Sequence, residues 1–118
     1  IIDAIDFVPA KVALAVFAKK NNIGIIECLG TGNRLDATKF YIKDIYKTSG
    51  CPLAKKMRSE LKKAGIDSLD VLVSDAPVIQ PTKLLSDKKR TVGSVSFVPS
   101  VAGLILASEV VKDISCFL

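Results

Sequence analysis

Two uniformly apolar segments with an amphipathic segment between them open the chain. The stretches "IIDAI" (residues 1–5) and "IGIIECLG" (residues 23–30) predict buried strands, because neither leaves a polar face for solvent. Residues 8–22 have apolar side chains at helical spacing, Pro9 in the first turn and basic residues near the end. A strand, a helix and a strand in this order make neighbouring parallel strands with a right-handed crossover. The opening therefore predicts an α/β fold.

The first predicted strand begins at Ile1 without an initiator methionine, a polar tail or a preceding partner strand. A bare apolar strand edge is normally paired or covered in proteins. Parallel strands also lie mostly inside sheets of several members. We therefore expect a segment upstream of Ile1 to supply the first half of the sheet.

The middle of the chain predicts a different strand type and a second helix. The stretch "KFYIKDI" (residues 39–45) alternates polar and apolar residues, which favours a more exposed, antiparallel strand. Residues 52–65 predict a helix with an apolar residue at every fourth position and Gly65 as its stop. The stretch "LDVLVSD" (residues 69–75) predicts a further strand. These elements extend the sheet and make it mixed.

The end of the chain is predicted to return to the core. Residues 76–93 are polar and rich in turn formers, so we expect a mobile excursion there. The stretch "SVSFV" (residues 94–98) alternates like a strand, and residues 99–114 predict a helix apolar enough to pack against protein on more than one side. No charged residue lies between residues 91 and 108, but proline, glycines and the alternation argue against a membrane helix.

Composition narrows the function classes. The 118 residues, 49% of them hydrophobic, suit one domain. The formal net charge of +5 tolerates anionic partners such as RNA or nucleotides. The chain has no histidine, which excludes Ser-His, Cys-His and His-metal chemistry within it. Its three cysteines form no C-x-x-C pair, which argues against a zinc site or a disulfide framework and suits a reducing cytoplasm.

Two aspartates bracket the end of the first predicted strand, where open α/β sheets place their ligands. A carboxylate at the position of Asp3 or Asp6 can hold Mg²⁺ or face a reacting phosphate. The alternative is that Asp6 only caps the following helix. Lys11, one turn into that helix, can reach the same phosphates, although a single lysine is more often solvated.

Three further features each allow a functional and a structural interpretation. The stretch "GTG" (residues 30–32) can approach a nucleotide or simply make a tight turn. Cys51 begins the second helix, a position that can lower a thiol pKa, but the chain offers no base for it. The basic surface of that helix is either solvated or a platform for RNA phosphates. It consists of Lys55, Lys56, Arg58, Lys62 and Lys63.

Five stretches combine into one pattern: "DAID", "GTGNRLDAT", "KTSGCPLAKKMRSEL", "SDAP" and "GSVSFVPSVAGLILASEVVKDI". Together they resemble the HesA/MoeB/ThiF superfamily of ubiquitin-activating-like adenylating enzymes, and within it the tRNA threonylcarbamoyladenosine dehydratases. The resemblance covers nearly the whole chain but only the second half of such enzymes. It implies that residues 1–118 are the C-terminal half of a ThiF-type adenylating domain, with a Rossmann-like mixed sheet and flanking helices.

The resemblance also implies site residues. It places Asp6 against the phosphates of ATP and Mg²⁺, as the catalytic and metal-binding carboxylate, with the main chain of Phe7 beside the nucleotide. The glycine-rich phosphate loop, the basic clamps and the ribose-binding acid of the family precede this segment, so we expect the 118 residues alone to be inactive. The chain lacks the paired C-x-x-C motifs of the sulfur-carrier branch, which favours the dehydratase branch. Ala37 replaces the usual proline of the dehydratase D-P-T loop.

For the intact enzyme, the resemblance implies a cytoplasmic homodimer that activates a carboxylate of tRNA-borne threonylcarbamoyladenosine as an acyl adenylate. Ring closure then expels AMP. Two alternatives remain open. The protein can instead activate the C-terminus of a ubiquitin-like or sulfur-carrier protein, which shares Asp6 but should use a cysteine. The chain can also be a non-catalytic dimerisation module that associates through its last helix and sheet edge.

Overall fold

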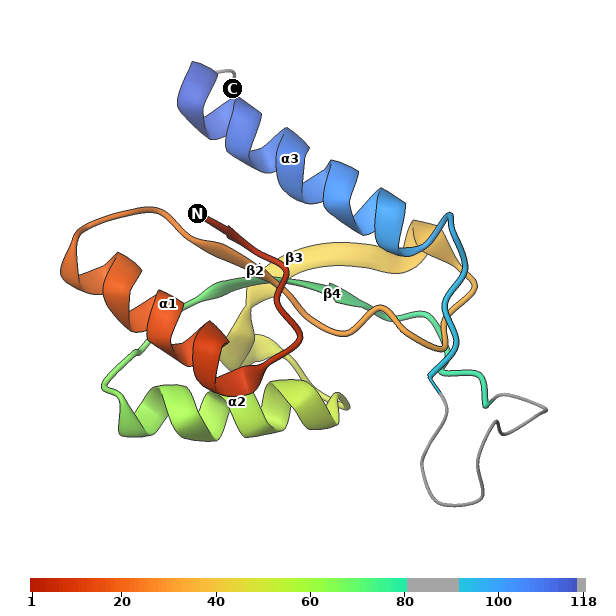
Figure 1. Ribbon diagram of the computed structural model, residues 1–118, viewed down its shortest axis with the longest axis horizontal. Helices are drawn as coiled ribbons and strands as arrows, with labels where there is room; N and C mark the ends of the chain where they lie inside the picture. Colours follow the sequence, from red (N-terminus) through yellow and green to blue (C-terminus); the bar gives the residue numbers. More distant parts are fainter. Residues whose placement is uncertain (81–91, 117–118) are drawn as a thin grey trace.

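A computed structural model describes residues 1–80 and 92–116 of the chain. Its centre is a four-stranded mixed sheet with the strand order β1-β2-β4-β3 (Figure 1). β1 pairs in parallel with β2, β2 pairs in parallel with β4, and β3 is antiparallel to β4. The strands are β1 (Ile2–Asp3), β2 (Ile26–Cys28), β3 (Phe40–Asp44) and β4 (Asp70–Ser74). The predicted α/β class, with parallel opening strands and an antiparallel third strand, is confirmed.

Helices cover both faces of this sheet (Figure 1). α1 (Val8–Lys20) and α2 (Pro52–Lys63) pack together on one face, and α3 (Pro99–Ser115) lies on the other. Short 3₁₀ turns, η1 (Ala37–Lys39) and η2 (Ile45–Lys47), flank β3. The larger core lies under α1 and α2, and its most buried members include Ala15, Ile45, Met57, Leu61 and Val71. A smaller cluster under α3 joins Ile26, Leu72, Ala102 and Leu106.

The unit β1–α1–β2 forms as the apolar pattern predicts. Pro9 lies in the first turn of α1, where its missing N–H costs no helical hydrogen bond. The helix ends at Lys20, two residues earlier than predicted, because Asn22 takes a left-handed conformation with φ of 54°. α2 ends in a similar manner, with Gly65 at φ of 77°.

The first strand differs from the prediction in length and burial. β1 holds only two residues, and Ile1 and Ile2 are 38% and 44% exposed. The chain leaves the sheet after Asp3, because the side chain of Asp3 accepts a hydrogen bond from the N–H of Ile5 and turns the backbone there (2.8 Å). The expectation of a buried strand over residues 1–5 is therefore wrong for this edge position.

The predicted strand at residues 94–98 is also wrong. This segment pairs with no strand among the described residues and ends in the turn that leads into α3. The N–H of Val98 donates to Val95 O (3.3 Å), and the N–H of Ala102 donates to Val98 O (3.1 Å). Pro99, at the start of α3, supplies the helix with its first residue. A sequence of alternating polar and apolar residues forms a strand only where a neighbouring strand can exchange backbone hydrogen bonds with it.

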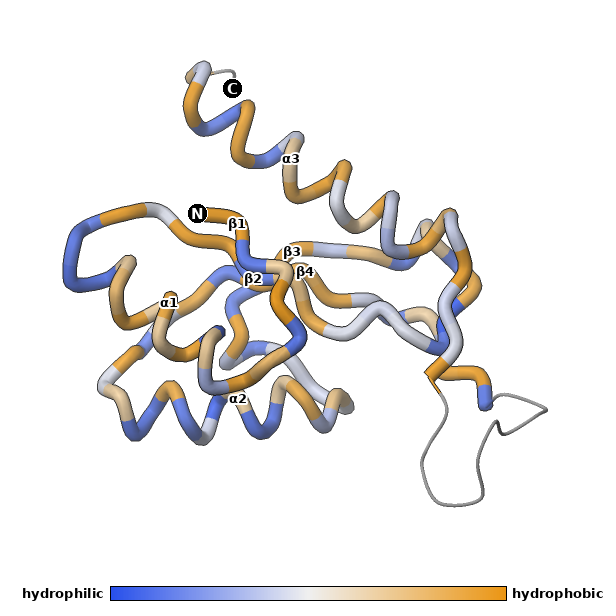
Figure 2. The backbone as a smooth tube through the Cα atoms, viewed as in Figure 1, coloured by the Kyte–Doolittle hydropathy of each residue, from blue (hydrophilic) through white to orange (hydrophobic). Residues whose placement is uncertain are grey.

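Within the described residues, α3 is packed on one side, and the expectation that it packs against protein on more than one side stays a prediction. Ala102 and Leu106 face the sheet and are buried, whereas Leu104 and Ile114 are 70% and 79% exposed. Figure 2 shows apolar segments, alternating with polar ones, along the whole length of α3. In the described part of the chain, no helix is long and apolar enough to cross a membrane. The segment expected to be mobile, residues 76–93, includes residues 81–91, which lie outside the described residues.

Candidate functional site

A cleft of about 670 Å³ lies at the carboxyl ends of the parallel strands. The segments that follow β1 and β2 form one side of it, and the first turns of α2 and α3 form another. A cleft at this end of a parallel sheet is where α/β proteins bind ligands, and its volume is in the usual range for small-molecule sites. The lining residues used below are Asp6, Lys11, Cys28, Gly32 and Cys51. The structure thus brings together the ends of β1 and β2, the glycine loop and the start of α2.

The glycine loop after β2 is fixed by the segment around residue 93. Asn33 and Gly93 exchange two hydrogen bonds, from Asn33 N to Gly93 O (2.8 Å) and from Gly93 N to Asn33 Oδ1 (2.6 Å). A Cβ atom at Gly32 would overlap the side chain of Val92. The glycine at this position is therefore explained by close approach of two chain segments. The alternative that this loop lies against a nucleotide stays a prediction.

Asp6 lies at the mouth of the cleft and is exposed. Its carboxylate has no hydrogen bond or ion pair with any of the described residues. The N-cap of α1 is Phe7, a residue that is 61% exposed, and no side chain caps this helix end. The alternative that Asp6 only caps α1 is therefore wrong. The position leaves a free carboxylate beside the cleft, and its role as metal and phosphate ligand stays a prediction, as does that of the Phe7 main chain.

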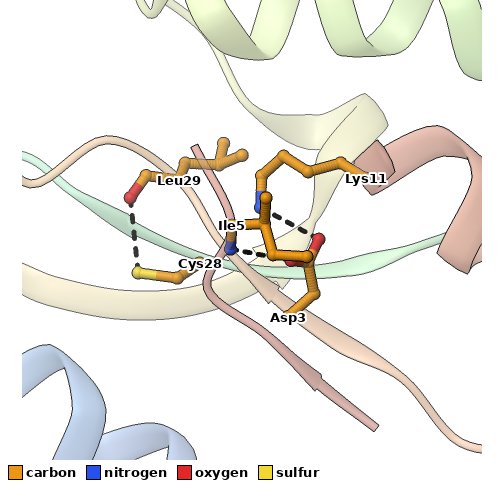
Figure 3. Close-up of polar contacts among 5 residues, drawn as sticks. All are labelled: Asp3, Ile5, Lys11, Cys28 and Leu29. Carbon is orange, nitrogen blue, oxygen red and sulfur yellow. Dashed lines mark hydrogen bonds and ion pairs between the residues drawn. The ribbon is translucent and has the colours of Figure 1, made fainter. Parts of the chain in front are cut away.

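Asp3 and Lys11 form a buried ion pair behind the cleft (Figure 3). Lys11 Nζ lies 3.1 Å from Asp3 Oδ2, and both residues are only 1% exposed. Asp3 Oδ1 accepts the hydrogen bond from Ile5 N–H, so both oxygens of Asp3 are used within the protein. Asp3 is therefore a structural carboxylate rather than a ligand. Lys11 is not solvated as a single lysine usually is, and although it lines the cleft, its ammonium group is engaged with Asp3.

Glu27 is the residue that sequence reasoning missed. It is fully buried on β2, in register with Asp3 on β1 and Val71 on β4, and so shares their face of the sheet. Neither of its carboxylate oxygens has a hydrogen-bond partner among the described residues. Burial away from water raises the pKa of Glu27 from 4.5 to about 8; the positive charge of Lys11 opposes this rise and the neighbouring Asp3 adds to it. In the sequence, this site was signalled only by a single glutamate in an otherwise apolar predicted strand.

Two cysteines line the cleft from different elements. Cys28, at the end of β2, donates from Sγ to Leu29 O (3.3 Å), and burial raises the pKa of its thiol above 9.0 (Figure 3). Such a thiol is a poor nucleophile. Cys51 is half-buried and is the N-cap residue of α2, but its side chain makes no capping hydrogen bond. A reactive role for Cys51 stays a prediction.

The basic surface of α2 is smaller than predicted. Arg58 does not belong to it, because its guanidinium group donates to Thr48 Oγ1 (2.6 Å) and Thr48 O (3.1 Å) and ties α2 to the end of η2. Lys63 pairs with Glu60 along the helix (2.9 Å). Lys55, Lys56 and Lys62 are exposed. We use the term basic face of α2 for Lys55, Lys56, Lys62 and Lys63.

The metal-coordinating side chains at the cleft suit an ion that is also coordinated by a bound ligand. Within residues 1–80 and 92–116, no three His, Cys, Asp or Glu side chains cluster closely enough to hold a metal ion by themselves. Mg²⁺ commonly uses one or two carboxylates together with phosphate oxygens and water. A single free carboxylate at Asp6 is compatible with that mode of binding and not with an all-protein cage.

Comparison with known proteins identifies similar chains. No protein-family model matches the chain. A tRNA threonylcarbamoyladenosine dehydratase of Bacillus subtilis is 36% identical over 129 residues, covering 97% of this chain and 50% of that protein. The crystal structure of the Escherichia coli tRNA N6-threonylcarbamoyladenosine dehydratase TcdA in complex with AMP matches with a TM-score of 0.79 and 28% identity, covering 98% of this chain and 48% of that one. The same enzyme in complex with ATP matches with a TM-score of 0.78 and 27% identity, over 98% and 47% of the two chains.

The chain spans about half the length of the curated relatives it matches. Within that span, the match runs through almost every residue of the chain in both sequence and structure. The resemblance inferred from the motifs and the Rossmann-like mixed sheet that it implied are both confirmed. This chain is thus similar, over nearly its whole length, to about half the length of the tRNA threonylcarbamoyladenosine dehydratases that it matches.

Proposed function

We propose that the protein containing this chain uses ATP to cyclise threonylcarbamoyladenosine in tRNA with loss of water. In this proposal, the chain is the C-terminal half of an adenylating domain, and it requires the other half for activity. The observation that supports it is the match of 97% of the chain to dehydratases, together with the fold match to one that was solved with AMP and with ATP.

The cleft can accommodate part of a nucleotide, and Asp6 would be its metal-binding residue. The cleft is open at the strand ends, and Asp6 lies at its mouth with no other partner among the described residues. Asp6 would hold Mg²⁺, which supplies positive charge against the phosphates and the developing transition state. Lys11 adds a positive charge to the wall of the cleft while it remains paired with Asp3.

The chemistry needs neither histidine nor a cysteine nucleophile. The substrate carboxylate attacks the α-phosphorus of ATP, and pyrophosphate leaves. An intramolecular nucleophile of the threonylcarbamoyl group then attacks the activated acyl carbon, loses its proton and displaces AMP, which carries away one oxygen of the carboxylate. ATP cleavage therefore drives the loss of water, in keeping with a chain that has no histidine. The basic face of α2 begins one turn from the cleft and would contact phosphates of the tRNA.

The test is an Asp6→Asn substitution in the full-length protein, assayed for ATP-dependent dehydration of threonylcarbamoyladenosine in tRNA. We expect the rate to fall roughly a hundredfold, the loss typical of a group that stabilises transition-state charge, with folding unchanged. The matched control is Asp67→Asn, which alters an exposed aspartate on the turn after α2, away from the cleft. A wild-type rate in the Asp6→Asn protein would overturn the assigned role, and a full-length wild-type protein without dehydratase activity would overturn the proposed function.

A second candidate is the activation of a ubiquitin-like or sulfur-carrier protein, and the position of Cys51 favours it. This thiol lines the cleft at the N-terminus of α2 and has no capping bond. If this candidate is correct, Cys51→Ala abolishes turnover because the thiol must accept the activated acyl group. Under the dehydratase proposal, the same variant retains its turnover, which is measured as AMP release with tRNA as substrate.

Homodimerisation also remains a prediction, and the outer side of α3 is the feature that favours it. Leu104, Val111 and Ile114 are each more than half exposed and lie on this helix. An apolar surface of this kind is a common feature of protein interfaces. A monomer at low concentration in light scattering would argue against a dimerisation module.

A further inference from the structure

The buried cluster of Glu27, Asp3 and Lys11 has more acidic groups than its one cation can neutralise. Asp3 faces Glu27 from β1, Lys11 faces it from α1, and the neighbour on β4 is the apolar Val71. The part of α2 packed on this face contributes Ala54, Met57 and Leu61 to the core and no charge. Two acids and one lysine, all 1% exposed or less, therefore share one buried region.

The hydrogen bonds in this cluster are distributed unevenly. Lys11 donates to Asp3, and Asp3 also accepts from Ile5 N–H, while no described residue donates a hydrogen bond to either oxygen of Glu27. A proton on Glu27 can instead bridge to the neighbouring Asp3 carboxylate, and this contact favours the neutral form of Glu27. Burying a carboxylate without a hydrogen-bond donor costs much free energy, whereas burying a neutral carboxylic acid in the same place costs much less. With Glu27 neutral, the charges of Asp3 and Lys11 cancel. With Glu27 ionised, the region would hold one uncompensated negative charge.

An ionised Glu27 would also compete for Lys11. The ammonium group of Lys11 has three donors, and among the described residues one of them is used, toward Asp3. A second carboxylate on the same face would attract the ammonium and repel Asp3. Asp3 is the group that holds Ile5 N–H, and Ile5 immediately precedes Asp6. The charge state of Glu27 is therefore linked through Asp3 to the backbone that carries Asp6.

We propose that Glu27 is a positioning residue for Asp6. As a neutral acid, Glu27 leaves the ammonium group of Lys11 paired with Asp3, and Asp3 then fixes the turn that places Asp6 at the mouth of the cleft. The importance of that turn rests on the proposed function, but the coupling itself does not. Loss of the proton from Glu27 weakens the hold of Asp3 on Ile5 N–H and loosens the turn. The cluster therefore couples the protonation state of Glu27 on β2 to the position of the exposed Asp6 carboxylate.

Nuclear magnetic resonance tests the coupling without any measurement of activity. The full-length protein is labelled with ¹³C at the side-chain carboxyl groups of Asp and Glu and with ¹⁵N on isoleucine, and is titrated from pH 6 to 9. We expect the Glu27 carboxyl signal to be that of a neutral acid at pH 6 and to titrate near pH 8. The Asp3 carboxyl and Ile5 amide signals should move with the same midpoint.

Two variants complete the test. In Glu27→Gln, which keeps a neutral side chain of the same shape, the Ile5 amide signal should keep its low-pH position across the whole range. In Cys28→Ala, which removes the thiol on the opposite face of β2, the titration near pH 8 should persist. The proposal is overturned if Glu27 titrates near its ordinary pKa, or if the Ile5 amide does not follow it. None of these results depends on ATP or tRNA, so they are separable from a failure of the proposed function.

Discussion

Replacing Glu27 by glutamine should stabilise the protein, and the gain should grow as the pH rises above 5. The folded protein keeps a proton on Glu27 up to a pKa of about 8, while the unfolded chain releases it near 4.5. Between these values the folded state binds one more proton than the unfolded state. The contribution of Glu27 to the free energy of unfolding of the wild-type protein therefore falls as the pH rises over this interval. Glutamine carries no such proton, so the variant does not have this loss.

The size of the effect follows from the two pKa values. Their difference of about 3.5 units corresponds to about 5 kcal/mol, at 1.36 kcal/mol per unit, for the whole interval. At pH 7, some 2.5 units above the unfolded value, the difference between variant and wild type should be about 3 kcal/mol. Below pH 4.5 both states of the wild-type protein hold the proton, and the two proteins should be nearly equally stable.

Urea unfolding of the wild-type protein and the Glu27→Gln variant at pH 5, 6, 7 and 8 measures this difference. Because ionisable groups outside this cluster act equally in both proteins, the difference between the two curves isolates Glu27 together with its coupling to Asp3 and Lys11. Glu60→Gln is the matched control, since Glu60 lies on the surface of α2 and, among the described residues, forms an ion pair with Lys63. Its effect should stay below about 1 kcal/mol at every pH. A stability difference between Glu27→Gln and wild type that does not change with pH would refute the reasoning.

Two further predictions concern the other charges. Lys11→Met should destabilise the protein by roughly 3–5 kcal/mol in urea unfolding, because it leaves Asp3 buried without its cation, and adding Asp3→Asn should restore most of this loss. Changing both Lys55 and Lys56 to Glu should weaken tRNA binding and make the slope of log binding constant against log salt concentration shallower by about 1–2 units. Filter binding at several salt concentrations measures this slope. The exposed Lys112 on α3, changed to Glu, should leave that slope unaltered, and equal slopes in all variants would exclude the basic face of α2 as the tRNA contact.

Elements governed by local rules could be predicted from the sequence. α2 begins at Pro52 and stops before Gly65, as the preferences of these two residues for a first turn and a left-handed φ require. Its apolar positions at every fourth residue became the buried Met57 and Leu61. In each case the deciding interaction lies within one or two turns of the chain.

Elements that depend on a distant partner could not be predicted. Residues 94–98 have the alternation of a strand, but no strand of the described sheet lies beside them, and they form a turn. The apolar residues of α3 indicated contact on several sides, whereas Leu104 and Ile114 are exposed in this chain. Periodicity reports which faces are apolar and leaves open what those faces contact.

The two aspartates after β1 show why the candidate site could be only partly predicted. Asp3 and Asp6 are three residues apart, and both fit the position at which α/β sheets bind ligands. Asp3 turns inward, where it pairs with Lys11 of α1 and lies in register with Glu27 of β2. Asp6 follows the turn that Asp3 creates and is left exposed at the cleft. The buried aspartate thus determines where the exposed one lies, and only the three-dimensional structure shows which of the two has a free carboxylate.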